Sequence, residues 1–136
     1  MKNIILVVED KIEEQMVAKN IVLESGKKII IANTLEKAEE FIDKFKDKLC
    51  GIMTDIHLPI NDTWNEASAN GLSVVITALR LGIPCVVCTD DIAHGARYIP
   101  HILSRMEQLS SRKIPTATSK NWADAFKKLS SLLEES

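Results

Sequence analysis

Short apolar runs alternate with amphipathic stretches along the whole sequence, and this alternation limits the fold more than any other feature. The runs have the length of β-strands and occupy residues 4–8, 28–32, 49–54, 84–88 and 114–118. The first run, Ile4-Ile5-Leu6-Val7-Val8, contains no polar position, which is typical of a strand buried on both faces of a sheet. Strands of this kind separated by helices predict an α/β fold with a parallel sheet.

The intervening stretches carry helical periodicity and helix-end signals. In the first of them, Ile12, Met16, Val17 and Ile21 recur at helical spacing. Thr34 is in the position of an N-cap for the helix predicted in the second intervening stretch. Helices are therefore predicted over residues 12–23, 35 to about 46, 71–82, 92 to about 109, and 121–133.

A polar stretch without clear periodicity separates the third predicted strand from the helix that follows it. It covers residues 61–70, and we expect an extended loop at about 60–70. Trp64 lies within this stretch in a polar setting. Two interpretations are open, since the indole can anchor a partner or can fold back over a short helical turn.

Length and composition limit the classes of protein to which the chain can belong. A chain of 136 residues has the size of one domain, so we expect a single domain over residues 1–136 with no attached output domain. Hydrophobic residues at 46% and charged residues at 26% indicate a folded globular chain rather than a disordered one. The net charge of -2 argues against a basic face for nucleic acid, and no apolar run approaches the ~20 residues that cross a bilayer.

The cysteines indicate a reducing compartment and a packing role. Cys50, Cys85 and Cys88 make an odd count in apolar surroundings, which suits reduced thiols and predicts a cytoplasmic location. Cys85-Val86-Val87-Cys88 has the spacing of a redox motif. Residues three apart on a strand point to opposite faces, so we interpret both as core cysteines.

Polar side chains gather where the predicted strands end. Glu9 and Asp10 follow the first strand, Asp55 the third, Thr89 the fourth and Lys120 the fifth. In an open parallel sheet, ligands bind beyond the carboxyl ends of the strands. We therefore expect these five side chains to converge on one site.

The convergence predicts a specific chemistry. Mg²⁺ prefers carboxylate oxygens and water, which Glu9, Asp10 and Asp55 can supply. A carboxylate can also attack phosphorus, provided that the charge on the phosphoryl oxygens is neutralised by a cation, an amine or a hydroxyl. Asp55 is the candidate nucleophile because it ends a central strand between the acidic pair and Thr89.

At these residues the sequence resembles the response-regulator receiver domain, the CheY-like family of two-component signalling. The resemblance spans essentially the whole chain. It rests on the segment Ile5-Leu6-Val7-Val8-Glu9-Asp10, on Asp55-Ile56-His57-Leu58-Pro59, on Asn70-Gly71-Leu72, and on Pro84-Cys85-Val86-Val87-Cys88-Thr89. It implies a flavodoxin-like, doubly wound (βα)5 three-layer sandwich with a five-stranded parallel sheet.

The resemblance also implies a function and its residues. Glu9, Asp10, Asp55 and the backbone carbonyl of His57 would bind Mg²⁺, and Asp55 would accept a phosphoryl group from a histidine kinase or phosphotransfer protein. Thr89 and Lys120 would contact that group. The chain would act through an unidentified downstream protein, as a monomer or weak homodimer, and would catalyse nothing beyond its own phosphorylation and dephosphorylation.

Two positions depart from the family pattern. The family lysine is usually followed by proline, whereas here the alternatives are Lys113, with Pro115 two residues on, and Lys120, followed by Asn121. Lys120 is preferred because Lys113 falls at the N-terminal end of the fifth strand. The residue after the hydroxyl is usually small, and here it is Asp90, whose carboxylate would repel a phosphoryl group or attract a cation.

Two other functions remain open at this point. A degenerate pseudo-receiver would keep the fold and act as a phosphorylation-independent interaction module, a reading that Asp90 and the lysine position favour. A binder of a small molecule or nucleotide would use the same crevice, but no glycine-rich phosphate loop follows any of the predicted strands.

Overall fold

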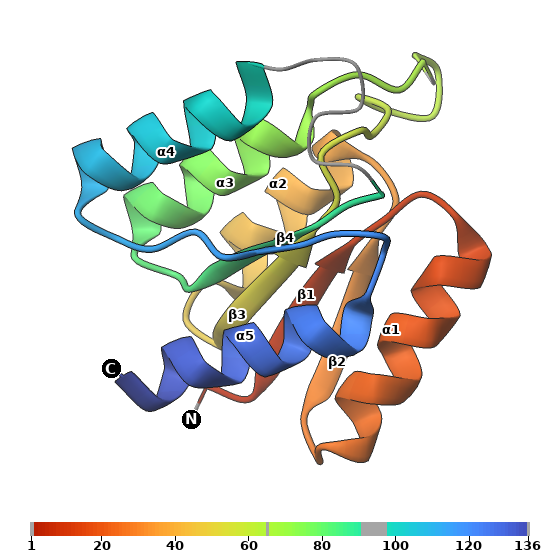
Figure 1. Ribbon diagram of the computed structural model, residues 1–136. Helices are drawn as coiled ribbons and strands as arrows, with labels where there is room; N and C mark the ends of the chain where they lie inside the picture. The colour runs from red at the N-terminus through yellow and green to blue at the C-terminus, as the bar shows by residue number, and fades with distance from the viewer. Residues whose placement is uncertain (1, 65, 91–97, 136) are drawn as a thin grey trace.

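Five helices and five strands alternate through the part of the chain that the computed structural model describes, residues 2–64, 66–90 and 98–135. Figure 1 shows their arrangement. In chain order they are β1 (Ile4–Val8), α1 (Ile12–Glu24), β2 (Lys28–Ala32), α2 (Leu35–Phe45), β3 (Leu49–Thr54), α3 (Gly71–Leu81), β4 (Cys85–Cys88), α4 (Tyr98–Ser110), β5 (Thr116–Ala117) and α5 (Trp122–Glu135).

The strands form one parallel sheet in the order β2-β1-β3-β4-β5. Along β1 the side chains of Ile5 and Val7 enter one core, and those of Leu6 and Val8 enter the other. Helices α1 and α5 cover the first core, and α2, α3 and α4 cover the second, as Figure 1 shows. This is the flavodoxin-like, three-layer (βα)5 fold, and burial on both faces explains why β1 is uniformly apolar.

The helix ends agree with the sequence signals. The Thr34 hydroxyl accepts a hydrogen bond from the Lys37 amide at 3.1 Å and so caps α2. Helix α3 ends at Gly82, which adopts a φ of 72°, a conformation that glycine reaches without steric cost. Both boundaries are therefore confirmed.

The edge strand is shorter than the sequence predicts. The predicted fifth strand over 114–118 is reduced to Thr116–Ala117 at the edge of the sheet. The predicted helix from Ile92 begins outside the described residues, and its described part is α4. The helix predicted over residues 12–23 is confirmed as α1, in which Ala18 and Val22 are buried and Ile21 packs against the core, whereas Ile12 is 70% exposed.

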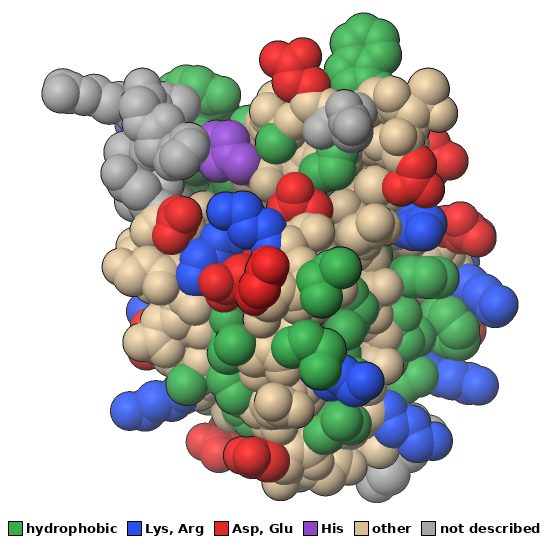
Figure 2. All heavy atoms as spheres, turned by 90° about the vertical axis from the view of Figure 1, so that its right-hand side faces the viewer, with side chains coloured by type: hydrophobic (Ala, Val, Ile, Leu, Met, Phe, Trp, Pro, Cys, Tyr) green, Lys and Arg blue, Asp and Glu red, His purple; other side chains and the backbone are tan. Residues whose placement is uncertain are grey.

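The exposed apolar residues of α1 lie on the side of the molecule that faces the viewer in Figure 2. Ile12, Met16, Val17 and Leu23 all keep about half or more of their surface accessible. Helical spacing alone shows that residues share a face, but it does not show whether that face meets the sheet. None of the described helices is long and apolar enough to cross a membrane.

The cysteines pack as predicted. Cys85 belongs to the core under α2, α3 and α4, and Cys88 belongs to the core under α1 and α5. Both thiols are free and buried, and burial raises the pKa of Cys85 to about 12 and that of Cys88 further. The opposite directions of the two side chains exclude a disulfide between them in this fold.

Candidate functional site

The acidic residues lie where the direction of the sheet connections reverses. Strands β1 and β3 are neighbours, but β1 continues into α1 on one face and β3 leads to α3 on the other. This divergence opens a crevice beyond the strand ends, which is where ligands bind in folds of this kind. Glu9 and Asp10 follow β1 at this point, and Asp55 follows β3, its amide donating to the Val8 carbonyl at 3.0 Å.

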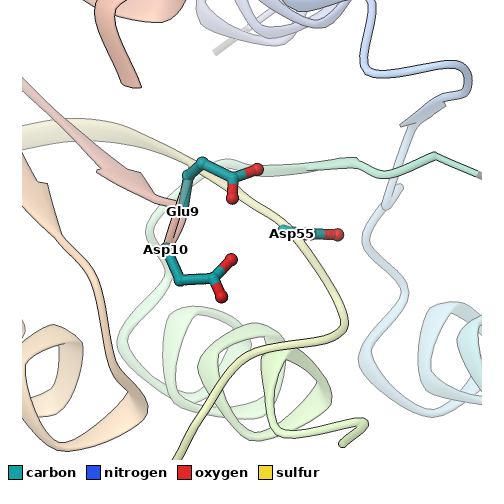
Figure 3. Close-up of side chains that lie close together, drawn as sticks. All are labelled: Glu9, Asp10 and Asp55. Carbon is teal, nitrogen blue, oxygen red and sulfur yellow. The ribbon is translucent and has the colours of Figure 1, made fainter. Parts of the chain in front are cut away.

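The three carboxylates form one cluster. Figure 3 shows Glu9 and Asp10 at the end of β1 beside Asp55, and one oxygen of each lies within 4.8 Å of the others. Glu9 is fully buried and Asp55 is 4% exposed, whereas Asp10 is accessible to solvent. Carboxylates held this close repel one another unless a cation or a proton intervenes.

Lys120 supplies that cation. Its ammonium group contacts Oε1 of Glu9 and lies 2.5 Å from Oδ2 of Asp55, with only 10% of its side chain exposed. The second oxygen of each carboxylate accepts a backbone hydrogen bond: Glu9 Oε2 from the Lys11 amide at 2.9 Å, and Asp55 Oδ1 from the Ile56 amide at 2.7 Å. The expected convergence of Lys120 and Asp55 on one site is thus seen as a direct ion pair.

A strained turn presents Lys120 to the carboxylates. Ser119 and Lys120 have φ values of 55° and 49°, a region that costs a residue with a Cβ roughly 1–2 kcal/mol. Two hydrogen bonds hold this turn against the end of β4: Lys120 donates to the Thr89 carbonyl at 3.0 Å, and Ser119 donates to the Asp90 carbonyl at 2.8 Å. The alternative, Lys113, pairs instead with Glu135 on the surface and is 72% exposed.

Burial and pairing move the pKa values of the cluster. Burial raises the pKa of Glu9 from its usual 4.5 to about 7, although the hydrogen bond from Lys120 opposes this shift. Burial alone would lower the pKa of Lys120, but the contacts with Asp55 and Glu9 outweigh it and raise that pKa to about 12. Lys120 is therefore charged at neutral pH, and Glu9 is close to its titration midpoint.

The raised pKa of Glu9 predicts how stability depends on pH in the absence of divalent metal. Between pH 4.5 and 7 the folded chain binds more protons at Glu9 than the unfolded chain does, so the free energy of unfolding falls as the pH rises. We expect a fall of about 2–3 kcal/mol across this window. Urea denaturation in a chelator, from pH 5 to 8, measures it.

The control compares two glutamates on either side of the same turn. Glu9→Gln removes the titrating group and should flatten the pH profile. Glu13→Gln, at an exposed position on α1, should leave the profile of the wild type unchanged. Equal slopes for the wild type and Glu9→Gln would show that another group is responsible.

A cavity of about 180 Å³ opens beside the cluster. It brings together most of the residues predicted for the site, and its lining consists of Asp10, Lys11, Asp55, His57, Ala67, Thr89, Asp90 and Lys120. Glu9 does not line the cavity but reaches it through its contact with Lys120. The cavity thus holds a buried carboxylate, an ammonium group and a hydroxyl side by side.

The loop before α3 closes one side of this cavity through Ala67. Leu58 and Ser68 exchange backbone hydrogen bonds of 3.0 and 3.3 Å, and the Asn70 side chain donates to the Leu58 carbonyl at 2.6 Å. At its tip Trp64 is 64% exposed, with its amide donating to the Asn61 side chain at 2.6 Å. The Trp64 side chain is thus largely exposed to solvent.

Three residues of the site were not predicted. Lys11 donates its amide to Glu9, Ala67 lines the cavity, and Gly71 touches the backbone of Asp55. A Cβ at position 71 would lie 1.9 Å from the Asp55 carbonyl oxygen, so only glycine fits there. The sequence signal was the Asn70-Gly71 pair before a helix, but the close approach depends on the tertiary structure.

The donor set suits a hard divalent cation. Three carboxylates offer oxygens at mutual distances of at most 4.8 Å, and the solvent-accessible Asp10 leaves room for the waters that Mg²⁺ retains. His57 also lines the cavity and is partly buried. Among the described residues, the side chains of Glu9, Asp10 and Asp55 form the group that can hold a metal.

No family model matches the sequence, and no curated protein matches it. Solved structures do match the fold. The CheY-like receiver domain protein from Methanospirillum hungatei JF-1 is 22% identical with a TM-score of 0.68, covering 99% of this chain and 96% of that one. The BeF3-activated N-terminal receiver domain of Klebsiella pneumoniae RstA is 21% identical with a TM-score of 0.66, covering 96% and 98%.

A third similar structure is the Mn²⁺-bound form of the response regulator Rcp1. It is 22% identical with a TM-score of 0.64, covering 96% of this chain and 91% of that one. All three likenesses extend over nearly the whole chain, so the fold is that of response-regulator receiver domains, as the resemblance in sequence had implied.

Proposed function

We propose that this chain, whose fold is that of response-regulator receiver domains, is a phosphorylatable signalling switch. Asp55 accepts a phosphoryl group from a histidine kinase or a phosphotransfer protein in a Mg²⁺-dependent reaction. The observation that carries the proposal is the arrangement at Asp55, where a buried carboxylate, the Lys120 ammonium and Thr89 meet at one cavity.

The chemistry follows from these groups. An oxygen of Asp55 attacks the phosphorus of a phosphohistidine, the P–N bond breaks, and the imidazole leaves with the electron pair and takes up a proton. Lys120 stabilises the charge that develops on the phosphoryl oxygens, and the Thr89 hydroxyl can donate a hydrogen bond to one of them. The product is an acyl phosphate on Asp55, whose hydrolysis returns the carboxylate.

Glu9, Asp10, Asp55 and the His57 carbonyl are the proposed metal ligands. When bound, Mg²⁺ would neutralise part of the charge of the phosphoryl group. The Rcp1 structure, which is Mn²⁺-bound, and the RstA structure, which is BeF3-activated, support the proposal by likeness of fold. The signal would pass by protein-protein contact to a downstream protein, with no nucleic acid or membrane involved.

Phosphorylation by small donors tests the proposal. The wild type is incubated with Mg²⁺ and either acetyl phosphate or phosphoramidate, and intact-mass spectrometry is expected to show the addition of one phosphoryl group. Asp55→Asn is expected to show none, because the amide is not a nucleophile toward phosphorus. Asp62→Asn, an exposed position on the loop beside the site, is the matched control and should behave as wild type.

The alternative function, that of a pseudo-receiver, predicts a different result in the same phosphorylation experiment. A pseudo-receiver that acts as a phosphorylation-independent interaction module would gain no mass with either donor in the wild type. Mass gain that persists in Asp55→Asn would show that another residue is the acceptor. Either result would contradict the assignment of Asp55.

A further inference from the structure

We propose that Asp90 determines the phosphoryl-donor specificity of this site: its carboxylate favours a divalent cation in the cavity and disfavours small donors that carry two negative charges. The inference rests on the proposed function. It concerns a position where the chain departs from the receiver pattern, since a carboxylate follows Thr89 in place of a small residue.

The backbone fixes Asp90 at the cavity. The Asp90 carbonyl accepts the hydrogen bond from Ser119 at 2.8 Å, and the neighbouring Thr89 amide donates to the Ala117 carbonyl at 3.0 Å. The backbone of Asp90 is thus hydrogen-bonded to the strained turn that carries Lys120, and Asp90 and Lys120 line the same cavity. The same hydrogen bonds hold the backbone of Asp90 next to the turn that carries Lys120, at the edge of the cavity that both residues line.

Asp90 makes the cavity anionic. Asp10, Asp55 and Asp90 line it together with two amines, so the lining carries a formal charge of -1. The Lys120 ammonium is already shared between Asp55 and the buried Glu9. Within the described ranges no lysine or arginine forms an ion pair with Asp90, and its residue is exposed.

A carboxylate that lines a cavity acts electrostatically on every ion that enters it. It attracts a divalent cation and repels a dianion such as acetyl phosphate, and the effect decreases with added salt. Removing the charge of Asp90 should therefore weaken the binding of a divalent cation and strengthen the binding of a dianion such as acetyl phosphate. A merely steric role for the side chain would not produce this pattern.

The experiment compares Asp90→Asn, which removes the charge at nearly constant size, with Asp90→Ala, which removes charge and bulk. Asp47→Asn is the control, because it removes the same charge from an exposed position before β3, at the opposite end of the sheet. Phosphorylation rates are measured at saturating Mg²⁺ with acetyl phosphate and with the less charged phosphoramidate. Mg²⁺ affinity is measured separately by calorimetry.

We expect Asp90→Asn to accelerate phosphorylation by acetyl phosphate roughly three- to tenfold at low salt, with a smaller gain for phosphoramidate. The same variant should bind Mg²⁺ roughly threefold more weakly or worse, and Asp90→Ala should match it. Asp47→Asn should change neither the phosphorylation rates nor the Mg²⁺ affinity appreciably. A wild type that reacts slowly beside a fast Asp90→Asn would support the inference.

Three results would overturn it. Unchanged rates and Mg²⁺ affinity in Asp90→Asn, with a wild type that accepts phosphate, would remove the inference and leave the proposed function intact. Acceleration in Asp90→Ala alone would assign the effect to bulk. Failure of every variant to accept phosphate from either donor would overturn the proposed function and the inference together.

Discussion

Replacing Lys120 by methionine is expected to cost about 3–5 kcal/mol of unfolding free energy at pH 8 in a chelator. The ammonium group contacts both Glu9 and Asp55, whose side chains are 0% and 6% exposed. Methionine preserves most of the packing but leaves two buried carboxylates facing each other without a cation. Urea denaturation monitored by circular dichroism measures the loss.

The same variant should recover stability in two ways. Lowering the pH toward 6 protonates Glu9, whose pKa already lies at about 7, and added Mg²⁺ supplies a replacement cation. Lys113→Met is the matched control, because Lys113 pairs with Glu135 on the surface and such pairs contribute less than about 1 kcal/mol. Equal losses in the two variants would contradict the role assigned to Lys120.

Replacing Gly71 by alanine is expected to cost about 3 kcal/mol, the upper part of the range for inserting a methyl group into a packed region. Helix propensity alone predicts the opposite sign, since alanine is favoured over glycine in a helix by about 1 kcal/mol. The added Cβ would lie 1.9 Å from the Asp55 carbonyl oxygen and 2.6 Å from the Ile56 Cα, and neither backbone atom can rotate away.

Gly51→Ala provides the comparison. There the three atoms nearest to the added Cβ all belong to the Leu129 side chain, the closest at 2.8 Å, and a leucine can change its rotamer. Its expected loss is smaller than that of Gly71→Ala in the same denaturation experiment. Because the clash at position 71 displaces Asp55, phosphoryl acceptance should fall as well. A stabilised Gly71→Ala would show that α3 does not pack against Asp55 as described.

Local patterns predicted most of the elements because local interactions decide them. The buried run of β1, the Thr34 cap and the Gly82 stop all lie where the sequence placed them. The prediction was weakest at Thr116–Ala117, where the strand is short and lies at the sheet edge. An edge strand has one neighbour and a mixed environment, so its residues carry a weaker apolar signal.

The periodicity of α1 predicted the helix but did not indicate which of its faces is buried. Ile12 and Met16 recur at helical spacing, yet the sheet packs against the smaller Ala18 and Val22. Hydrophobicity alone does not distinguish a buried helix face from an exposed one, because apolar atoms contribute more than half of the surface of a folded protein. The direction in which α1 leaves β1 decided which face is buried.

The sequence by itself determined that Glu9, Asp10, Asp55, Thr89 and Lys120 stand at the ends of strands, because each follows an apolar run of strand length. It also favoured Lys120 over Lys113, since an apolar run has a direction and only one lysine follows it. The tertiary structure alone decided that the Lys120 ammonium reaches both carboxylates. That contact depends on two left-handed residues and on the order β1-β3-β4-β5, which no local pattern encodes.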